Sequence, residues 1–237
     1  MENFMSLTLL KNFILNELSG WKKAELIWMA FCSLAILGLS LNMQDTPLGI
    51  IAALTGTWYT LWAGKGKISC YFFGIINSIC YGLISYRYRF FGEVMLNLGY
   101  YLPMMFVGIF CWKNHLSDHG VIKKTSLSLK GKAVLLLSTI VAITLYGLLL
   151  KCLNGRTPYL DSLTTILSVA AMIMTVKRCS EQWLLWIIVN TASIIMWLNV
   201  FLQNGSAISS LLMWIISLAN GFIFYFQWAK EVKKQNG

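Results

Sequence analysis

Eight long stretches of the chain are dominated by apolar residues, and short polar or charged segments separate them. The stretches cover about 22–42, 46–64, 68–86, 90–112, 131–152, 157–176, 183–203 and 206–228. A helix needs about 20 mostly apolar residues to cross the hydrocarbon core of a bilayer. The intervening segments carry turn or charge signals such as DTP, GKGK and NGRTP. The pattern therefore predicts an all-α membrane protein with eight spanning helices.

The first twenty residues follow a different pattern. Leu7, Leu10, Ile14 and Leu18 recur at helical spacing, whereas Lys11 interrupts the apolar run. We expect residues 1–20 to form an amphipathic segment on the membrane surface. The lysine, and the lack of a small-residue cleavage site after the run, argue against a secretory signal peptide.

Composition and charge add an orientation to the eight spans. The chain has 237 residues, of which 57% are hydrophobic and 12% are charged, and its net charge is +10. With eight spans, all but four of the 19 lysines and arginines fall on one side of the membrane; the four are Arg87, Arg89, Lys151 and Arg156. The positive-inside rule then places both termini in the cytoplasm. The basic charge needs no nucleic acid to explain it, and the expected partner is the lipid bilayer itself.

Two parts of the chain share one arrangement. Residues 46–77 and 157–190 each open with Thr-Pro, cross the membrane, turn at a short basic loop and return through a helix that contains an asparagine. Each part is followed by a third helix that ends at Trp112 or Trp228. The single helix between the two units gives them the same orientation, as in one class of transporters whose substrate site lies between repeats.

The predicted organisation follows from this repeat. Residues 45–114 and 154–229 are two parallel three-helix repeats, and residues 115–153 are a cytoplasmic loop and a linker helix. Residues 21–44 form an extra N-terminal transmembrane helix, and residues 230–237 form a cytoplasmic tail. The extra helix is expected to stand outside the repeat, at the periphery.

The candidate site begins with Trp183, Trp186 and Asn190. Their spacing of three and then four residues places them on one helix face. An unpaired amide in lipid costs several kcal/mol, so this face is expected to meet protein or water. Trp183 alone could equally be an interfacial anchor at the helix end.

Other candidates lie on the matching helices. Asn77 shares its face with Phe73 and Tyr81, and Asn97 and Asn220 lie inside the third helices of the two repeats. Single asparagines often only bridge helices, but four of them among aromatic rings favour a ligand site.

The predicted site contains aromatic rings and amides and has no charged residue at its centre. Aromatic planes stack on flat rings and attract delocalised cations, and amides suit sugar hydroxyls. A neutral or singly cationic solute with a ring and a polyol fits best, and we expect no metal, no cofactor and no catalysis. Glu93 and Asp161, near the outer surface, are expected to cap helix starts; the alternative is that they attract a cationic solute.

These features resemble the PnuC family of bacterial vitamin transporters. The resemblance is carried by GKISCYFFGIIN (66–77), by residues 161–190, by the helix ends at Trp112 and Trp228, and by a W-x-x-W-x-x-x-N motif at Trp183, Trp186 and Asn190. It implies a fold similar to SWEET sugar transporters and substrate contacts at the motif residues and at Asn77, Asn97 and Asn220.

The resemblance also implies a function. It implies uptake of nicotinamide riboside by facilitated diffusion across the bacterial inner membrane, with trapping by a cytosolic kinase. Thiamine or riboflavin transport by the same kind of cleft is the alternative, and a membrane scaffold or an intramembrane enzyme is a weaker one. The sequence is also compatible with a homo-oligomer.

Overall fold

The structure, a computed structural model, describes residues 15–117, 120–153 and 158–236. Its helices are α2 (Lys23–Asn42), α3 (Pro47–Lys65), α4 (Cys70–Arg87), α5 (Phe91–Val94), the π-helix η1 (Met95–Tyr101), α6 (Leu102–Lys113), α7 (Leu129–Cys152), α8 (Pro158–Val176), α9 (Gln182–Asn204) and α10 (Ile208–Asn236). Apart from two isolated β-bridges, the regular structure in the described ranges is helical. Most of the predicted surface segment, residues 1–14, lies outside these ranges.

Local sequence explains where several helices begin and end. The hydroxyl of Thr46 accepts a hydrogen bond from the backbone N–H of Gly49 at 3.1 Å, and a proline follows at the first helical position of α3. Gly66 ends the same helix with φ +72°, a left-handed conformation that glycine adopts without strain. The hydroxyl of Ser128 caps α7 in the same way as Thr46 caps α3, so α7 begins two residues before the predicted start at 131.

The predicted apolar stretches coincide with helices, but the helices differ in how apolar they are. Six helices are long and apolar enough to cross a membrane: α2, the continuous helix Phe91–Lys113, α7, α8, α9 and α10. The protein is therefore a multi-pass membrane protein. Helices α3 and α4, of 19 and 18 residues, fall outside these six and carry several Thr, Ser, Tyr and Gly residues. Many of these side chains are buried between helices instead of facing lipid.

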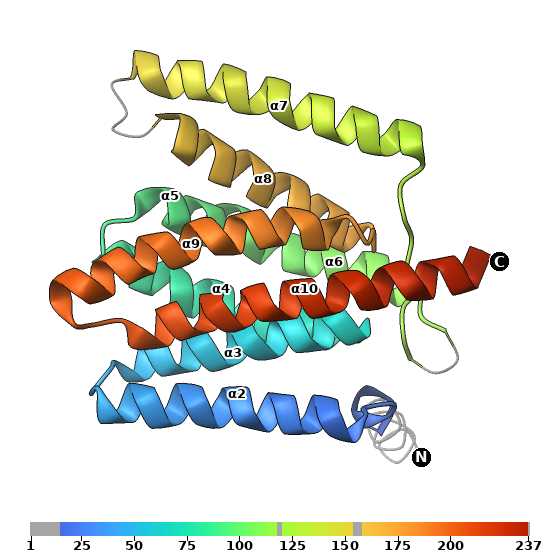
Figure 1. The fold of residues 1–237 in the computed structure, drawn as a ribbon, viewed down its shortest axis with the longest axis horizontal. Helices are drawn as coiled ribbons and strands as arrows, with labels where there is room; N and C mark the ends of the chain where they lie inside the picture. The colour runs from blue at the N-terminus through green and yellow to red at the C-terminus, as the bar shows by residue number, and fades with distance from the viewer. Residues whose placement is uncertain (1–14, 118–119, 154–157, 237) are drawn as a thin grey trace, which may run out of the picture.

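The long helices lie side by side in one bundle (Figure 1). Helix α2 lies at one edge, against α3 and α10, and α7 lies at the opposite edge, against α8. Between them, α3 packs on α4 and α10, and α8 packs on α9 and α6. The first helix of each predicted repeat therefore contacts the last helix of the other, a reciprocal pattern that brings the two halves together. The start of α2 and the end of α10 lie at the same end of the bundle (Figure 1).

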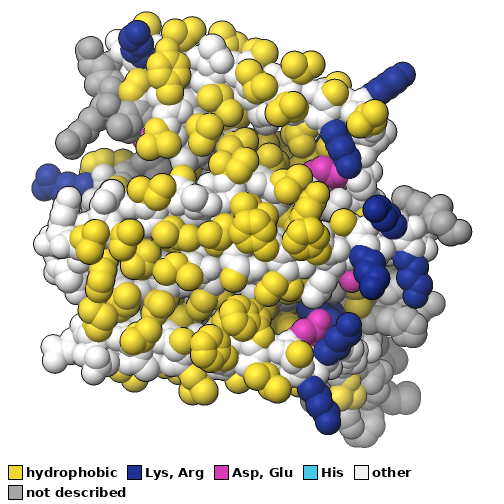
Figure 2. All heavy atoms as spheres, viewed as in Figure 1, with side chains coloured by type: hydrophobic (Ala, Val, Ile, Leu, Met, Phe, Trp, Pro, Cys, Tyr) yellow, Lys and Arg dark blue, Asp and Glu magenta, His cyan; other side chains and the backbone are white. Residues whose placement is uncertain are grey.

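Basic and apolar side chains lie on different parts of the surface. Figure 2 shows most of the lysine and arginine side chains on this face gathered at the end of the bundle where α10 ends, which we call the basic end. Apolar side chains cover the middle of the same face (Figure 2). On α7, for example, Leu137 and Leu145 are each 63% exposed. Such a belt of exposed apolar side chains is what a lipid-facing surface requires.

Helices α3 and α10 approach each other closely at two glycines of α3. A Cβ atom added to Gly64 would lie 2.3 Å from the ring of Phe224, and one added to Gly56 would lie 2.5 Å from the sulfur of Met213. Small residues permit such backbone approach in membrane helices. Gly56 and Met213 also line the interior cavity described next.

Candidate functional site

A cavity lies between the two halves of the bundle. Its walls come from α3, α4, η1, α6, α8, α9 and α10, so both predicted repeats contribute. Among the described residues, the lining contains no Asp, Glu, Lys, Arg or His.

The structure brings most of the predicted site residues to this one cavity. The predicted residues that line it are Asn77, Tyr81, Asn97, Trp183, Trp186 and Asn190. Phe73 and Asn220 do not line it. The side chains come from α4 and η1 in the first half of the chain and from α9 in the second half.

Asn190 differs from the other candidate asparagines because its amide is free. The residue is 4% exposed, and within the described part of the chain its side chain makes no hydrogen bond. Three other lining side chains have buried polar atoms without a partner: the Tyr59 hydroxyl, Gln182 Nε2 and Trp183 Nε1. Buried polar groups in proteins are almost always paired. This group of unpaired donors and acceptors is what a polar ligand would satisfy.

Aromatic rings form much of the cavity wall. Trp183 packs against Phe224 and Trp228 at centroid distances of 5.4 and 5.7 Å and is 3% exposed. Trp186 lies 6.0 Å from the ring of Tyr101, and its indole N–H donates to the hydroxyl of Thr175 at 3.1 Å. Trp183 is therefore held mainly by core packing, and Trp186 keeps more of its ring available to the cavity.

Two of the lining asparagines already donate a hydrogen bond through their Nδ2 groups. The Nδ2 group of Asn77 donates to the carbonyl of Ala52 at 2.8 Å, which ties α4 to α3. The Nδ2 group of Asn97 donates to the carbonyl of Glu93 at 2.9 Å. In both cases the amide oxygen accepts no hydrogen bond within the described residues, so it is free to accept one from a ligand.

The two predicted residues outside the lining have structural partners. Asn220 accepts a hydrogen bond from Trp28 Nε1 at 2.9 Å and donates one to the hydroxyl of Thr60 at 2.9 Å. It thereby joins α10 to α2 and α3. Phe73 packs edge-on against Trp58 and Trp62. Asn220 thus bridges helices, as single asparagines in membrane helices often do.

The Tyr81 hydroxyl on the cavity wall is held by two tryptophan side chains. Its hydroxyl oxygen accepts hydrogen bonds from Trp197 Nε1 at 2.7 Å and from Trp214 Nε1 at 3.1 Å. With both lone pairs occupied, the hydroxyl can only donate. Tyr81 therefore offers one fixed donor at the junction of α4, α9 and α10.

Several lining residues were not predicted from the sequence. Tyr59, Gln182, Tyr101 and Trp214 all line the cavity. Gln182 directly precedes the tryptophan motif, and a polar residue next to that motif was an available signal. Tyr59 and Tyr101 are common types in membrane helices, and nothing in their spacing separates them from core residues.

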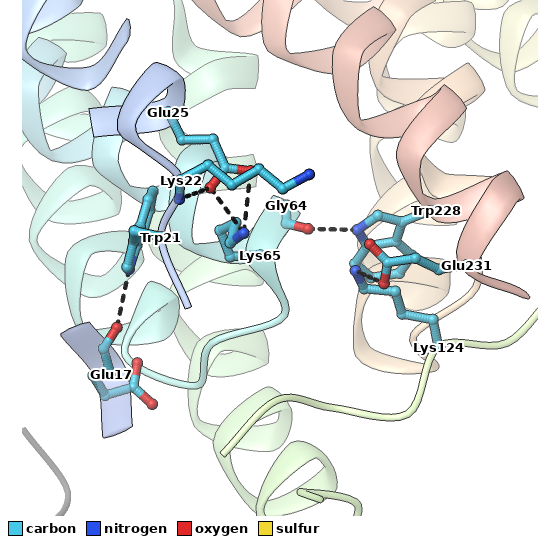
Figure 3. Close-up of polar contacts among 9 residues, drawn as sticks. All are labelled: Glu17, Trp21, Lys22, Glu25, Gly64, Lys65, Lys124, Trp228 and Glu231. Carbon is cyan, nitrogen blue, oxygen red and sulfur yellow. Dashed lines mark hydrogen bonds and ion pairs between the residues drawn. The ribbon is translucent and has the colours of Figure 1, made fainter. Parts of the chain in front are cut away.

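The basic end of the bundle is tied together by side chains from four segments (Figure 3). Trp228 Nε1 donates to the carbonyl of Gly64 at 2.7 Å, and Lys124 lies 4.9 Å from the Trp228 ring and 2.6 Å from the Glu231 carboxylate. Nearby, Lys65 pairs with Glu25 at 2.9 Å (Figure 3). These contacts join α2, the end of α3, the loop before α7 and α10.

Burial and hydrogen-bond partners shift the pKa values of two charged groups in this region. Burial lowers the pKa of the Lys124 ammonium group, although its partner Glu231 raises it. Burial raises the pKa of the Glu181 carboxyl, but hydrogen bonds from Ser126, the backbone and Lys132 lower it more, so the net pKa is below the ordinary value. Glu181 accepts from Ser126 at 2.7 Å and thereby fixes the loop before α7 to the start of α9.

Comparison with known proteins gives the family. A family described as "Nicotinamide mononucleotide transporter" matches residues 46–230. The nicotinamide riboside transporter PnuC of Haemophilus influenzae is 37% identical over 222 residues, covering 92% of this chain and 95% of that protein. The chain belongs to the PnuC family.

Other members of the PnuC family agree in sequence and structure. The nicotinamide riboside transporter PnuC of Neisseria mucosa is 33% identical over 225 residues, covering 92% of this chain and 85% of that protein. The crystal structure of the vitamin B3 transporter PnuC superimposes with a TM-score of 0.85 at 32% identity, covering 94% of this chain and 98% of that one. The resemblance seen in the sequence is confirmed, and the fold is that of a PnuC transporter.

Proposed function

We propose that this chain takes up nicotinamide riboside across the bacterial inner membrane. The observation that carries the proposal is the free amide of Asn190, next to unpaired polar atoms of Trp183, Gln182 and Tyr59, in a cavity walled by aromatic rings. A pyridinium ring can stack on indole, and the carboxamide and ribose hydroxyls can pair with the free amide and hydroxyl groups. The relatives named as nicotinamide riboside transporters support the same substrate.

The described lining favours the riboside over the mononucleotide. A phosphate group carries about two negative charges and binds where arginine, lysine or a helix N-terminus meets it. The cavity lining offers no lysine or arginine among the described residues. We therefore assign to this cavity the riboside, whose ribose carries no phosphate, and not its phosphate ester.

The transport mode we propose is facilitated diffusion. Coupling to protons or sodium commonly relies on ionisable groups that face the transport path; the described cavity lining has no charged residue, and the intramembrane carboxylate of Glu93 lies behind it. Accumulation then depends on a cytosolic kinase, because the phosphorylated product is too polar for an aromatic, uncharged path back. The protein in this proposal is a carrier, not an enzyme.

The proposed architecture has eight spans in two parallel repeats, similar to SWEET transporters, with both termini in the cytoplasm. Reciprocal packing of α3 on α10 and of α8 on α6 supports the repeat. Helices α2 and α7 extend it, because each precedes and packs on the first helix of its half. In this proposal the extra N-terminal helix takes a position equivalent to that of the linker helix.

The test is a calorimetric titration of the purified protein with nicotinamide riboside, nicotinamide mononucleotide, thiamine and riboflavin. We expect binding of nicotinamide riboside and at least tenfold weaker binding of the other three. Micromolar binding of thiamine or riboflavin, with none for nicotinamide riboside, would assign the cavity to the other vitamin. Preference for the mononucleotide would refute the argument from the uncharged lining.

A further inference from the structure

Glu93 lies in α5, in the third position of the helix that runs from Phe91 to Lys113. The sequence predicted that it caps the start of that helix; the structure places it in the first turn, but no side chain makes a capping hydrogen bond there. Its carboxylate accepts from Asn97 Nδ2 at 3.4 Å, and no backbone N–H in the described residues donates to it. None of the salt bridges in the described part of the chain includes Glu93.

The carboxylate lies directly behind the cavity wall. Its hydrogen-bond partner Asn97 is 3% exposed and lines the cavity. Asn97 and Tyr101 both belong to the π-helix η1, and π-helical turns occur frequently at functional sites. One acidic group thus contacts a lining side chain of a cavity whose described lining carries no charge.

A carboxylate within a membrane-spanning helix is costly and is usually retained for a function. Its field decays slowly through the low-dielectric protein, so it favours positive charge in the neighbouring cavity. We propose that Glu93 determines substrate specificity by favouring solutes whose ring carries a delocalised positive charge. This inference rests on the proposed function, because the oxidised nicotinamide ring of the riboside is such a cation.

The test compares one substrate in two charge states. Nicotinamide riboside is a cation, whereas its reduced dihydro form is neutral and has nearly the same shape. Glu93→Gln removes the charge and keeps an oxygen that can accept from Asn97. We expect the dissociation constant of the cation to rise about tenfold, from Coulomb's law at about 10 Å and an effective dielectric constant of about 20. That of the neutral form should stay within about twofold, and Glu93→Asp should retain most of the preference.

Asp161→Asn is the matched control. Asp161 occupies the first turn of α8, is exposed and does not line the cavity. We expect it to leave the preference for the cation unchanged. Equal weakening of both ligands by Glu93→Gln would show that Glu93 only positions Asn97, and an unchanged preference would show that it has no electrostatic role; either result overturns the inference. If the parent protein binds neither form, the proposed function itself fails, and the inference fails with it.

Discussion

Replacing Asn190 by leucine separates a substrate contact from a structural one. Leucine has the same number and branching of side-chain heavy atoms as asparagine, but it is larger and has no amide. Asn190 has no hydrogen-bond partner among the described residues, so its loss orphans no protein group. A substrate group left unpaired in the cavity costs on the order of 1–3 kcal/mol, which corresponds to about a 5- to 150-fold rise in the dissociation constant.

The matched comparison is Asn220→Leu. Asn220 is also fully buried, but it joins Trp28 on α2 to Thr60 on α3. Its replacement leaves an indole N–H and a hydroxyl without their partner, at a cost to folding of about 1–3 kcal/mol. We therefore expect Asn220→Leu to lower the melting temperature, and Asn190→Leu to leave it unchanged or raise it slightly.

The assay combines calorimetric titration of nicotinamide riboside with thermal unfolding of each variant in the same detergent. Asn190→Leu should lose most of its affinity at a parental melting temperature, and Asn220→Leu should show the lower melting temperature. The reasoning is refuted if Asn190→Leu binds as tightly as the parent. It is also refuted if Asn190→Leu unfolds at a temperature as low as Asn220→Leu does, because the amide would then be a helix bridge.

Three further predictions concern the aromatic wall and the basic end. Trp186→Ala should weaken binding of nicotinamide riboside more than Trp183→Ala does. Trp183→Ala should lower the free energy of unfolding more, by about 3–5 kcal/mol, because the Trp183 ring is packed in the core. The reverse order of the two variants in titration and in melting would contradict this. Tyr81→Phe should lower the melting temperature, since it orphans two indole N–H groups at about 1–3 kcal/mol each, and an unchanged melting curve would speak against the buried pair of bonds. The lowered pKa of Glu181 stabilises the fold fully above the ordinary carboxyl value of 4.5, and this stabilisation is lost as the pH falls through the lowered value. The melting temperature of the parent should therefore fall more steeply between pH 7 and pH 3 than that of Glu181→Gln, and parallel curves would show that the carboxylate is not responsible.

Most of the helix positions could be predicted from the sequence, because in a bilayer the apolar length of a segment decides whether it can span. The predicted stretches and the observed helices differ by at most two residues, except that α10 continues to Asn236. The extension carries Lys230, Glu231, Lys233 and Lys234, so no apolar pattern marks it. Within this extension Glu231 pairs with Lys124, a residue of another segment, and such a contact cannot be read from the local sequence.

The site could be predicted only in part. Trp183, Trp186 and Asn190 share a helix face that is visible in the sequence, and all three reach the cavity. Asn77 and Asn220 look alike in sequence, since both are asparagines inside apolar helices. Asn77 lines the cavity and Asn220 does not, because the packing of α2 supplies Asn220 with an indole partner. Which amides are paired is a tertiary property that spacing does not contain.

Transport itself is tested by uptake of labelled nicotinamide riboside into liposomes that contain the purified protein and no kinase. The proposed mechanism predicts uptake that stops when the internal and external concentrations are equal, with or without an imposed proton or sodium gradient. Enclosing a nicotinamide riboside kinase with ATP should raise the total label inside as the phosphate ester. Accumulation of unmodified nicotinamide riboside several-fold above the external concentration under either gradient would contradict facilitated diffusion.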